Sequence, residues 1–337
     1  MSSSTLQRNR TRVQSSAKPD RQLALRCTCC KSPLSCNPSS LIPLFESSIR
    51  CFVCGNIIWN DRGVWNALSP ERENYYLGFI RQDESIRQQE GRGDKRAEYY
   101  LALPFRDLSG KFSWQWHIRS RTYRYLVNNI LPSIGPYLDV LDLGAGNGWL
   151  SYRLSKLGHR PVAVDLLTNS TDGLGAASCY LPHLPFAFPR FRAEFDDLPF
   201  EDAQFDCAIF SASFHYAEDY ERTLGEAMRC VRDGGAVVIA DTEWYSDERT
   251  GQRIVAERDA TSQKQFGYQP KALNHQEFLT DERLRGQEHS LGISWETHTP
   301  YYGLRLSLRS VDAWLRRKRE PAQFRIYVAR IKHDRPL

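Results

Sequence analysis

Residues 140–149 read VLDLGAGNGW, and this stretch constrains the fold more than any other part of the chain. Its three glycines alternate directly after a run of apolar residues that favours a β-strand. Because glycine is costly to order, such a run is expected where a backbone turns sharply or approaches a ligand. The following NGWLSYRLSKLG has the apolar spacing of an amphipathic helix. Strand, glycine turn and helix together predict the first unit of an α/β sheet.

Strands and helices continue to alternate after this unit. Apolar strands are expected within residues 137–144, 159–166, 190–195, 205–214 and 236–242, with helices between them. Short buried strands separated by helices indicate a parallel sheet covered on both faces. Two more strands, around Ser290–His298 and Gln323–Lys332, are expected to pair antiparallel at the sheet edge.

Cysteines concentrate near the N-terminus, where six of the nine lie between Cys27 and Cys54. Cys27, Cys30, Cys51 and Cys54 form two C-x2-C pairs, the spacing of a tetrahedral Zn²⁺ site. Four protein ligands would fill the coordination sphere, so the zinc is predicted to be structural. Cys29 is an alternative ligand to Cys30, in the less usual C-x-C geometry. The odd cysteine count, without an export signal, argues against a disulfide framework.

Four regions are expected along the chain. Residues 1–22 form a disordered basic tail, 23–69 a zinc-ribbon-like domain, 70–135 a helical bridge or lid, and 136–337 the α/β domain. The N-terminal residues lack a secretory apolar core, and no apolar run is long enough to span a bilayer. The expected location is cytoplasmic, with no membrane partner. The net charge of +5 permits RNA as a partner without demanding it.

A ligand of an open parallel sheet binds beyond the carboxyl ends of its strands, so the turn from Gly144 to Gly148 is expected to hold a cofactor. The turn departs from the dinucleotide pattern G-x-G-x-x-G, because its third glycine comes one residue early and Trp149 follows. Asp142 is expected to place a negative charge at the edge of the pocket. This combination favours a cationic ligand without a phosphate.

Two further positions indicate which other groups the ligand carries. Asp165 ends the second strand, where an acid accepts both hydroxyls of a ribose. Glu194 and Phe195 follow the third strand, where a carboxylate, a backbone N–H and a ring suit an adenine. An amino-acid ammonium, a ribose and an adenine together describe S-adenosylmethionine.

Residues 137–245 resemble the class I S-adenosylmethionine-dependent methyltransferases, especially the type 11 group. The matching stretches are VLDLGAGNG, VAVDL, AEFDDLPFEDAQFD and EAMRCVRDGGAVVIAD. The resemblance implies a Rossmann-like seven-stranded sheet, mostly parallel with an antiparallel edge strand. Glu194 departs mildly from it, since aspartate is usual there. The predicted cofactor contacts are Asp142, Gly144, Ala145, Gly146, Asn147, Gly148, Asp165, Leu166, Glu194, Phe195 and Ser211.

The cysteine-rich segment is similar to the zinc ribbon that precedes some methyltransferases, including a group acting on 23S ribosomal RNA guanine. The bridge after it does not resemble that group, so the substrate does not transfer.

Candidate catalytic residues follow the fourth and fifth strands. His215 and Tyr216 are expected at the lip of the crevice, beside Ser211. Among these candidates, only His215 has a side chain whose ordinary pKa is near working pH, so it is the candidate general base. The alternative is a structural role, in which its imidazole hydrogen-bonds the loop or packs on the cofactor. Asp241, Glu243 and Tyr245 end the next strand, and their alternative is to cap the following helix. A general base is needed only if the acceptor loses a proton.

The predicted function is methyl transfer to a small-molecule acceptor at oxygen or carbon, with nitrogen allowed, because the aromatic-rich bridge suits a closed pocket. One alternative is an RNA base methyltransferase, with the ribbon, the tail and the basic run at 315–320 contacting phosphate. Another is a zinc-containing interaction protein that binds the cofactor but is inactive.

Overall fold

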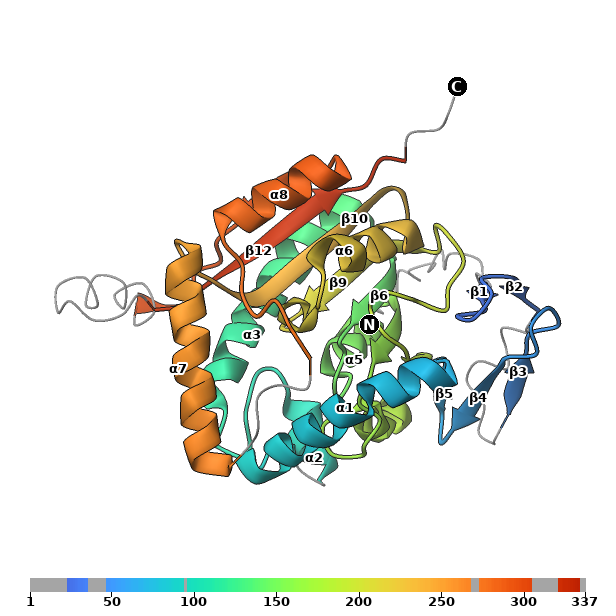
Figure 1. Cartoon of the computed structure of the whole chain (residues 1–337), viewed down its shortest axis with the longest axis horizontal. Coiled ribbons are helices and arrows are strands. Elements are labelled where there is room, and N and C mark those ends of the chain that lie inside the picture. The colour runs from blue at the N-terminus through green and yellow to red at the C-terminus, as the bar shows by residue number, and fades with distance from the viewer. Residues whose placement is uncertain (1–22, 36–46, 94–95, 268–272, 305–320, 334–337) are drawn as a thin grey trace, which may run out of the picture.

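The computed structural model describes residues 23–35, 47–93, 96–267, 273–304 and 321–333. The predicted basic tail and the basic run at 315–320 lie outside the described residues. In the described part, one sheet of ten strands runs in the order β11-β12-β10-β9-β6-β7-β8-β5-β4-β3 (Figure 1).

Seven strands form the expected α/β sheet, and the predicted fold class is confirmed. They are β6 (Asp139–Leu143), β7 (Arg160–Asp165), β8 (Arg190–Arg192), β9 (Phe205–Ser211), β10 (Val231–Trp244), β11 (Trp295–His298) and β12 (Gln323–Arg330). Strands β6 to β10 pair in parallel. Strand β12 is antiparallel to both β10 and β11, so the reversed strand lies one place inside the edge.

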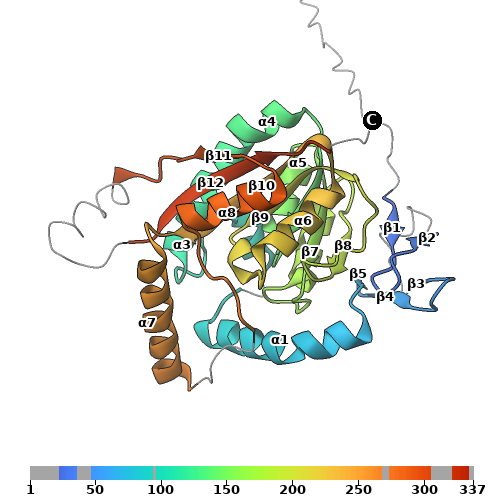
Figure 2. The same cartoon turned by 45° about the horizontal axis from the view of Figure 1, so that its top comes forward.

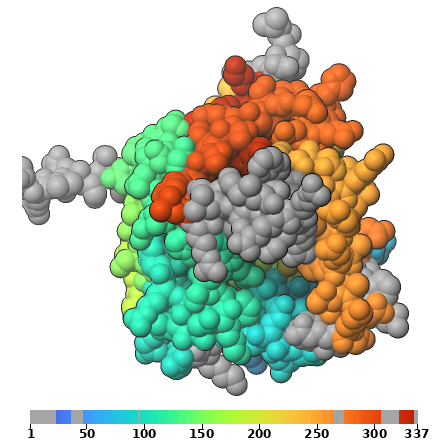
Figure 3. Space-filling view, turned by 90° about the vertical axis from the view of Figure 1, so that its left-hand side faces the viewer, coloured from blue at the N-terminus to red at the C-terminus, as the bar shows by residue number. Residues whose placement is uncertain are grey.

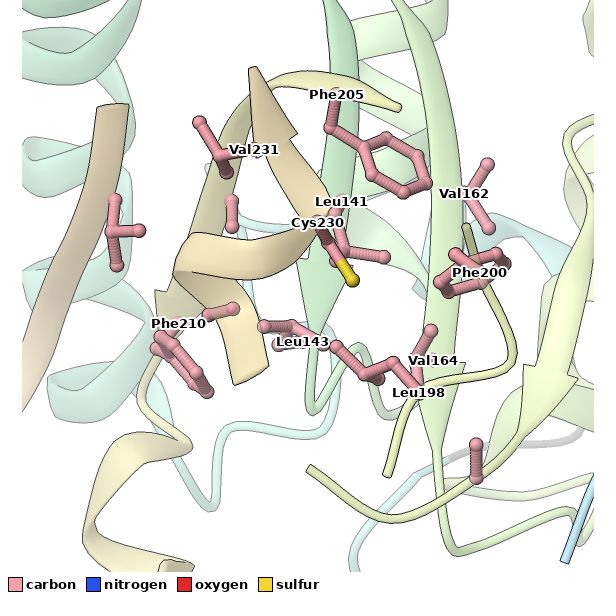
Figure 4. Packing of buried hydrophobic residues seen from close by; sticks show 14 of the residues in the cluster. Leu141, Leu143, Val162, Val164, Leu198, Phe200, Phe205, Phe210, Cys230 and Val231 are labelled. Carbon is pink, nitrogen blue, oxygen red and sulfur yellow. The ribbon is translucent and has the colours of Figure 1, made fainter. Parts of the chain in front are cut away.

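Helices cover both faces because the strand residues alternate between two apolar clusters. One face packs against α6 (Tyr220–Cys230) and α8 (Asp281–Leu291), with Leu141 and Val164 among its strand residues (Figure 4). The other face carries Val140 and Ile209. It packs against α2 (Ala97–Ala102), α3 (Ser113–Tyr125), the π-helix η2 (Leu126–Ile130), α4 (Leu131–Ile134), α5 (Trp149–Lys156) and the 3-10 helix η3 (Leu174–His183).

The cysteine-rich segment is joined to this sheet. Strands β1 (Leu25–Arg26) and β2 (Pro33–Leu34) form a separate hairpin, whereas β3 (Ser48–Arg50), β4 (Ile57–Asp61) and β5 (Val64–Asn66) extend the large sheet. Strand β5 pairs in parallel with β8, and Trp65 lies opposite Phe191. Trp65 is 1% exposed and belongs to the same core cluster as Phe191. The ribbon therefore shares the core of the α/β domain.

Three elements lie near the carboxyl ends of the parallel strands: α1 (Pro70–Glu90), the 3-10 turn η4 (Phe214–Tyr216) and α7 (Glu248–Phe266). Helix α1 starts with Ser69, whose hydroxyl accepts from Arg72 N–H, and stops at Gly91 in the left-handed conformation. It runs from β5 toward α7 (Figure 2). Figure 3 shows α7 (orange) along one side of the face that also carries the α3 segment. Within the described residues, none of the helices is long and apolar enough to cross a bilayer.

Candidate active site

A cavity of about 480 Å³ opens where the parallel strands end. Its walls come from α1, α3 and α7, from the turns after β6 to β9, from the end of β10 and from residues 273–277. This is the crevice position at which an open α/β sheet binds ligands, and the volume suits a small molecule. Of the predicted cofactor contacts, Gly144, Ala145, Gly146, Asn147, Asp165, Leu166, Phe195 and Ser211 line it.

The glycines of the first turn face different neighbours. All three have positive φ: +73° at Gly144, +54° at Gly146 and +76° at Gly148. A Cβ on Gly144 would lie 2.2 Å from Ser213 Cβ, and one on Gly148 would lie 2.9 Å from Ala177 Cβ. At Gly146 the nearest atom would be 3.5 Å away. Packing within the protein thus requires the outer two glycines, and Gly146 leaves bare backbone beside the cavity.

Asp165 is fixed against this turn. Its Oδ2 accepts from Gly146 N–H at 2.8 Å, and its Oδ1 accepts from Leu167 N–H at 2.8 Å. Burial raises the pKa of this carboxyl, while the two backbone N–H groups favour its charged form. Each oxygen keeps a further lone pair, so the carboxylate can accept two more hydrogen bonds from a ligand.

Asp142 does not place its charge at the edge of the pocket. Its side chain is 1% exposed and lies outside the cavity lining. Oδ2 accepts from the N–H of Ser151 at 3.1 Å and from its hydroxyl at 2.7 Å, and burial raises the pKa of Asp142 to about 7. The structure therefore gives Asp142 a role in fixing α5 to β6, and corrects the expected negative charge.

Glu194 has partners that could not be predicted from the sequence. Its carboxylate accepts from Arg72 Nε at 2.9 and 3.0 Å and from the Tyr76 hydroxyl at 2.9 Å, and it is 3% exposed. Glu194 is absent from the cavity lining, whereas the next residues, Phe195 and Asp196, are part of it. The adenine assignment at Glu194 stays a prediction, with a carboxylate already engaged by α1.

His215 and Tyr216 both line the cavity, as expected for the lip of the crevice. Burial lowers the pKa of His215 to about 3, so its imidazole is neutral near pH 7. The hydroxyl of Tyr216 accepts from Arg87 Nη2 at 3.3 Å. A neutral imidazole can still accept a proton, but with so low a pKa it is a weak general base.

Asp241 and Glu243, near the end of β10, do not cap the following helix. Asp247 caps α7 by accepting from Thr250 N–H at 2.8 Å. Asp241 instead lines the cavity, with φ at +57° and the side chain almost completely buried. Burial raises the pKa of Asp241 to about 6. Glu243 also lines the cavity and accepts from the Tyr245 hydroxyl at 2.8 Å.

The four predicted metal ligands meet in space. The sulfur atoms of Cys27, Cys30, Cys51 and Cys54 all lie within 4.8 Å of one another. Cys27 Sγ is 3.6 Å from Cys54 Sγ, and Cys30 Sγ is 3.5 Å from Cys51 Sγ. A tetrahedral Zn²⁺ with bonds of about 2.3 Å needs sulfurs about 3.8 Å apart, so the donor set fits the ion. Cys29 is exposed and outside the cluster.

The geometry agrees with the comparisons to known proteins. Residues 141–239 match the family model described as "Methyltransferase domain". The chain is 32% identical over 118 residues to the sarcosine/dimethylglycine N-methyltransferase of Halorhodospira halochloris, covering 34% of this chain and 41% of that protein. It is 33% identical over 110 residues to the malonyl-[acyl-carrier protein] O-methyltransferase of Erwinia pyrifoliae, covering 32% and 38%. The chain thus spans less than half the length of these curated relatives.

Solved structures superpose on parts of this chain at low identity. YcgJ from Bacillus subtilis superposes with a TM-score of 0.43 and 15% identity, over 59% of this chain and 94% of that one. An O-methyltransferase family protein from Burkholderia thailandensis gives 0.44 and 16%, over 79% and 71%.

Proposed function

We propose that this protein transfers a methyl group from S-adenosylmethionine to a small-molecule acceptor, since residues 141–239 match the model of a methyltransferase domain. The observation that carries the proposal is the contact between Asp165 and Gly146, which joins a carboxylate to bare backbone at the cavity wall. The two relatives named above, which by name methylate an amine and an acyl-carrier-bound acid, support the reaction class.

The residues present fit the cofactor. Asp165 has free lone pairs for a ribose diol, and Gly146 allows close approach of an uncharged or cationic group. Phe195 offers a ring that packs edge-on against Phe210. When bound, S-adenosylmethionine supplies an activated methyl group on a sulfonium, so the chain's own task is to align the acceptor and to exclude water.

A small acceptor is favoured by the cavity walls. Aromatic side chains from α1, α2 and α3, among them Tyr99 and Trp116, line it together with charged groups such as the half-buried Arg119. Such a lining suits a ligand that is enclosed and held by a few specific polar contacts.

The proposal is tested by calorimetry with S-adenosylhomocysteine, followed by incubation with methyl-labelled cofactor and an extract of the source cell. We expect heat of binding, and label in the small-molecule fraction. Asp165→Ala is expected to weaken binding of S-adenosylhomocysteine by at least about tenfold, because two hydrogen bonds to a charged group are lost. Tight binding of a nicotinamide nucleotide without binding of S-adenosylhomocysteine would refute the proposal. Label in RNA would favour the alternative substrate.

A further inference from the structure

Four arginines line the cavity, and they differ in their partners. Three have carboxylate partners: Arg87 with Asp83 and Asp172, Arg92 with Glu90, and Arg258 with Glu277. The guanidinium of the fourth, Arg119, makes neither an ion pair nor a hydrogen bond with any residue in the described part of the chain. It lies over the ring of Trp116, 4.7 Å from the centroid.

An unpaired guanidinium in this position is costly. Burial lowers the pKa of Arg119, which means that its surroundings disfavour the charge. A guanidinium nevertheless stays protonated in proteins. Arg119 is half-buried, and a guanidinium taken partly out of water without a hydrogen-bonded counter-ion gains from a ligand that supplies the anion. The cavity therefore holds one guanidinium whose N–H groups have no hydrogen-bond partner among the described residues, although Asp241 and Asp172 favour its charge from a distance.

Asp241 faces the same cavity with one oxygen in use and one without a partner. Oδ1 accepts from the Thr122 hydroxyl at 2.5 Å, and Thr122 Oγ1 is 3.0 Å from the Tyr302 hydroxyl. Because Thr122 has a single O–H and uses it on Asp241, Tyr302 donates to Thr122. Oδ2 is buried and has no hydrogen-bond partner among the described residues. The φ of +57° is strained for aspartate and is typical of functional sites.

Arg119 and Asp241 influence each other without touching. Each changes the titration of the other electrostatically, yet they form no direct ion pair within the described structure. A ligand between them would meet a hydrogen-bond donor with one positive charge on α3, and an acceptor at the end of β10. A single guanidinium beside the negatively charged Asp241 suits a singly charged carboxylate better than a dianionic phosphate.

We infer that the methyl acceptor is a small carboxylic acid that carries an O–H or N–H nucleophile, with Arg119 binding its carboxylate and Asp241 Oδ2 accepting the hydrogen of its nucleophile. This inference rests on the proposed function and names the substrate class of the same site. When the nucleophile takes the methyl group, its lone pair forms the new bond to carbon. The electron pair of the broken carbon–sulfur bond stays with sulfur, and the hydrogen passes to Asp241.

The first test measures anion preference by calorimetry, using full-length, zinc-loaded protein saturated with S-adenosylhomocysteine. The probes are matched acids and amides: glycolate and glycolamide, sarcosine and sarcosinamide, 4-hydroxybenzoate and 4-hydroxybenzamide. At least one acid is expected to bind about tenfold more tightly than its amide, as a charge-assisted hydrogen bond provides. Arg119→Gln should abolish the preference, and Arg119→Lys should retain part of it. Arg124→Gln, an exposed position on the same helix, should leave it unchanged.

The second test addresses Asp241 with the hydroxylated acid of that panel that binds best and its analogue without the hydroxyl. Wild-type protein should prefer the hydroxylated form, and Asp241→Asn should reduce that preference while the preference for acid over amide persists. The inference is overturned if no acid binds better than its amide, if Arg119→Gln keeps the preference, or if Asp241→Asn leaves the hydroxyl preference intact. Failure of wild-type protein to bind S-adenosylhomocysteine would instead refute the proposed function itself.

Discussion

Glycine is required at Gly144 for two reasons that act together. The backbone has φ at +73°, which costs any other residue about 1 to 2 kcal/mol, and an added Cβ would overlap Ser213. Gly144→Ala is therefore expected to lower the free energy of unfolding by at least about 2 kcal/mol, seen as a lower midpoint of thermal unfolding. Gly225→Ala, in α6 with open space around it, should be neutral or stabilising. Equal effects of the two variants would contradict this account.

Asp241 predicts a specific pH dependence of stability. Its pKa in the folded protein is raised to about 6, above the value near 3.9 of an unfolded chain. The folded state thus binds the proton more tightly, so this residue's contribution is present below pH 4 and is lost as the pH rises through 6. The groups facing it are Thr122, Tyr302 and Arg119.

Asp241→Asn removes this titration. Between pH 4 and pH 7 the variant should gain about 2 to 3 kcal/mol relative to wild-type protein, measured as the difference between their unfolding free energies at each pH. The comparison cancels the other buried carboxyls, including Asp142, which titrate alike in both proteins. Parallel stability curves across this range would show that the carboxyl does not titrate as the structure indicates.

Asp142 and Asp165, which flank the predicted cofactor turn, show how much of the candidate site could be predicted from the sequence. Asp165 ends its strand, so its side chain can turn to the sheet edge, and its place beside the glycine turn could be predicted. Asp142 lies inside β6, two residues from Val140 and on the same face, where α5 covers it. Because side chains alternate between the two faces of a strand, the burial of Asp142 on the face of Val140 could have been predicted from its position. Partners such as Arg72 for Glu194 could not be predicted, because 122 residues separate them.

At the level of elements, α1 is held to the turn after β8 by Arg72 and Glu194. Because Glu194 is almost completely buried, removing Arg72 leaves the negative charge of Glu194 without a counter-ion and away from water. Arg72→Met should therefore cost about 3 kcal/mol or more of unfolding free energy in chemical denaturation, and adding Glu194→Gln should restore part of it. Arg222→Met breaks an ion pair with Asp196 whose arginine is 62% exposed, and should cost less than about 1 kcal/mol. Similar losses of unfolding free energy for Arg72→Met and Arg222→Met would contradict the claim that the Arg72–Glu194 ion pair holds α1 in place.

Helices α1 and α3 lie within residues 70–135, where a helical bridge was expected, since apolar periodicity is a local property. Which side chains of these helices line the cavity depends on how the helices pack against the sheet, which is not a local property. The sequence reasoning noted the aromatic residues of the bridge as a possible lid, but not that Arg87, Arg92 and Arg119 would reach the same cavity. Charged residues on a helix, such as Arg87 and Arg119, or just after one, such as Arg92, are usually solvated, so no local signal distinguishes these three.

At the scale of the whole molecule, one sheet runs from the cysteine-rich segment to the strands that border the candidate cofactor site. The cysteine spacing predicted the four-cysteine cluster, but nothing in the sequence indicated that β5 would pair with β8. Strand pairing between residues 65 and 191 is a long-range event that neither segment encodes alone. Its consequence is that the ribbon, β8 and the Glu194–Phe195 turn form one continuous stretch of structure.

Loss of the metal is therefore expected to reach the cofactor site. Cys30→Ser removes one of the four clustered thiols, so the ribbon should lose zinc and the folding energy that the metal supplies. With β5 no longer supported, the turn after β8 should loosen, and affinity for S-adenosylhomocysteine should fall by at least about tenfold in calorimetry. Cys29→Ser changes an exposed thiol outside the cluster, and should keep both zinc content and affinity. If zinc-free Cys30→Ser protein bound S-adenosylhomocysteine as tightly as wild-type protein, the sheet edge would hold the cofactor site independently of the metal.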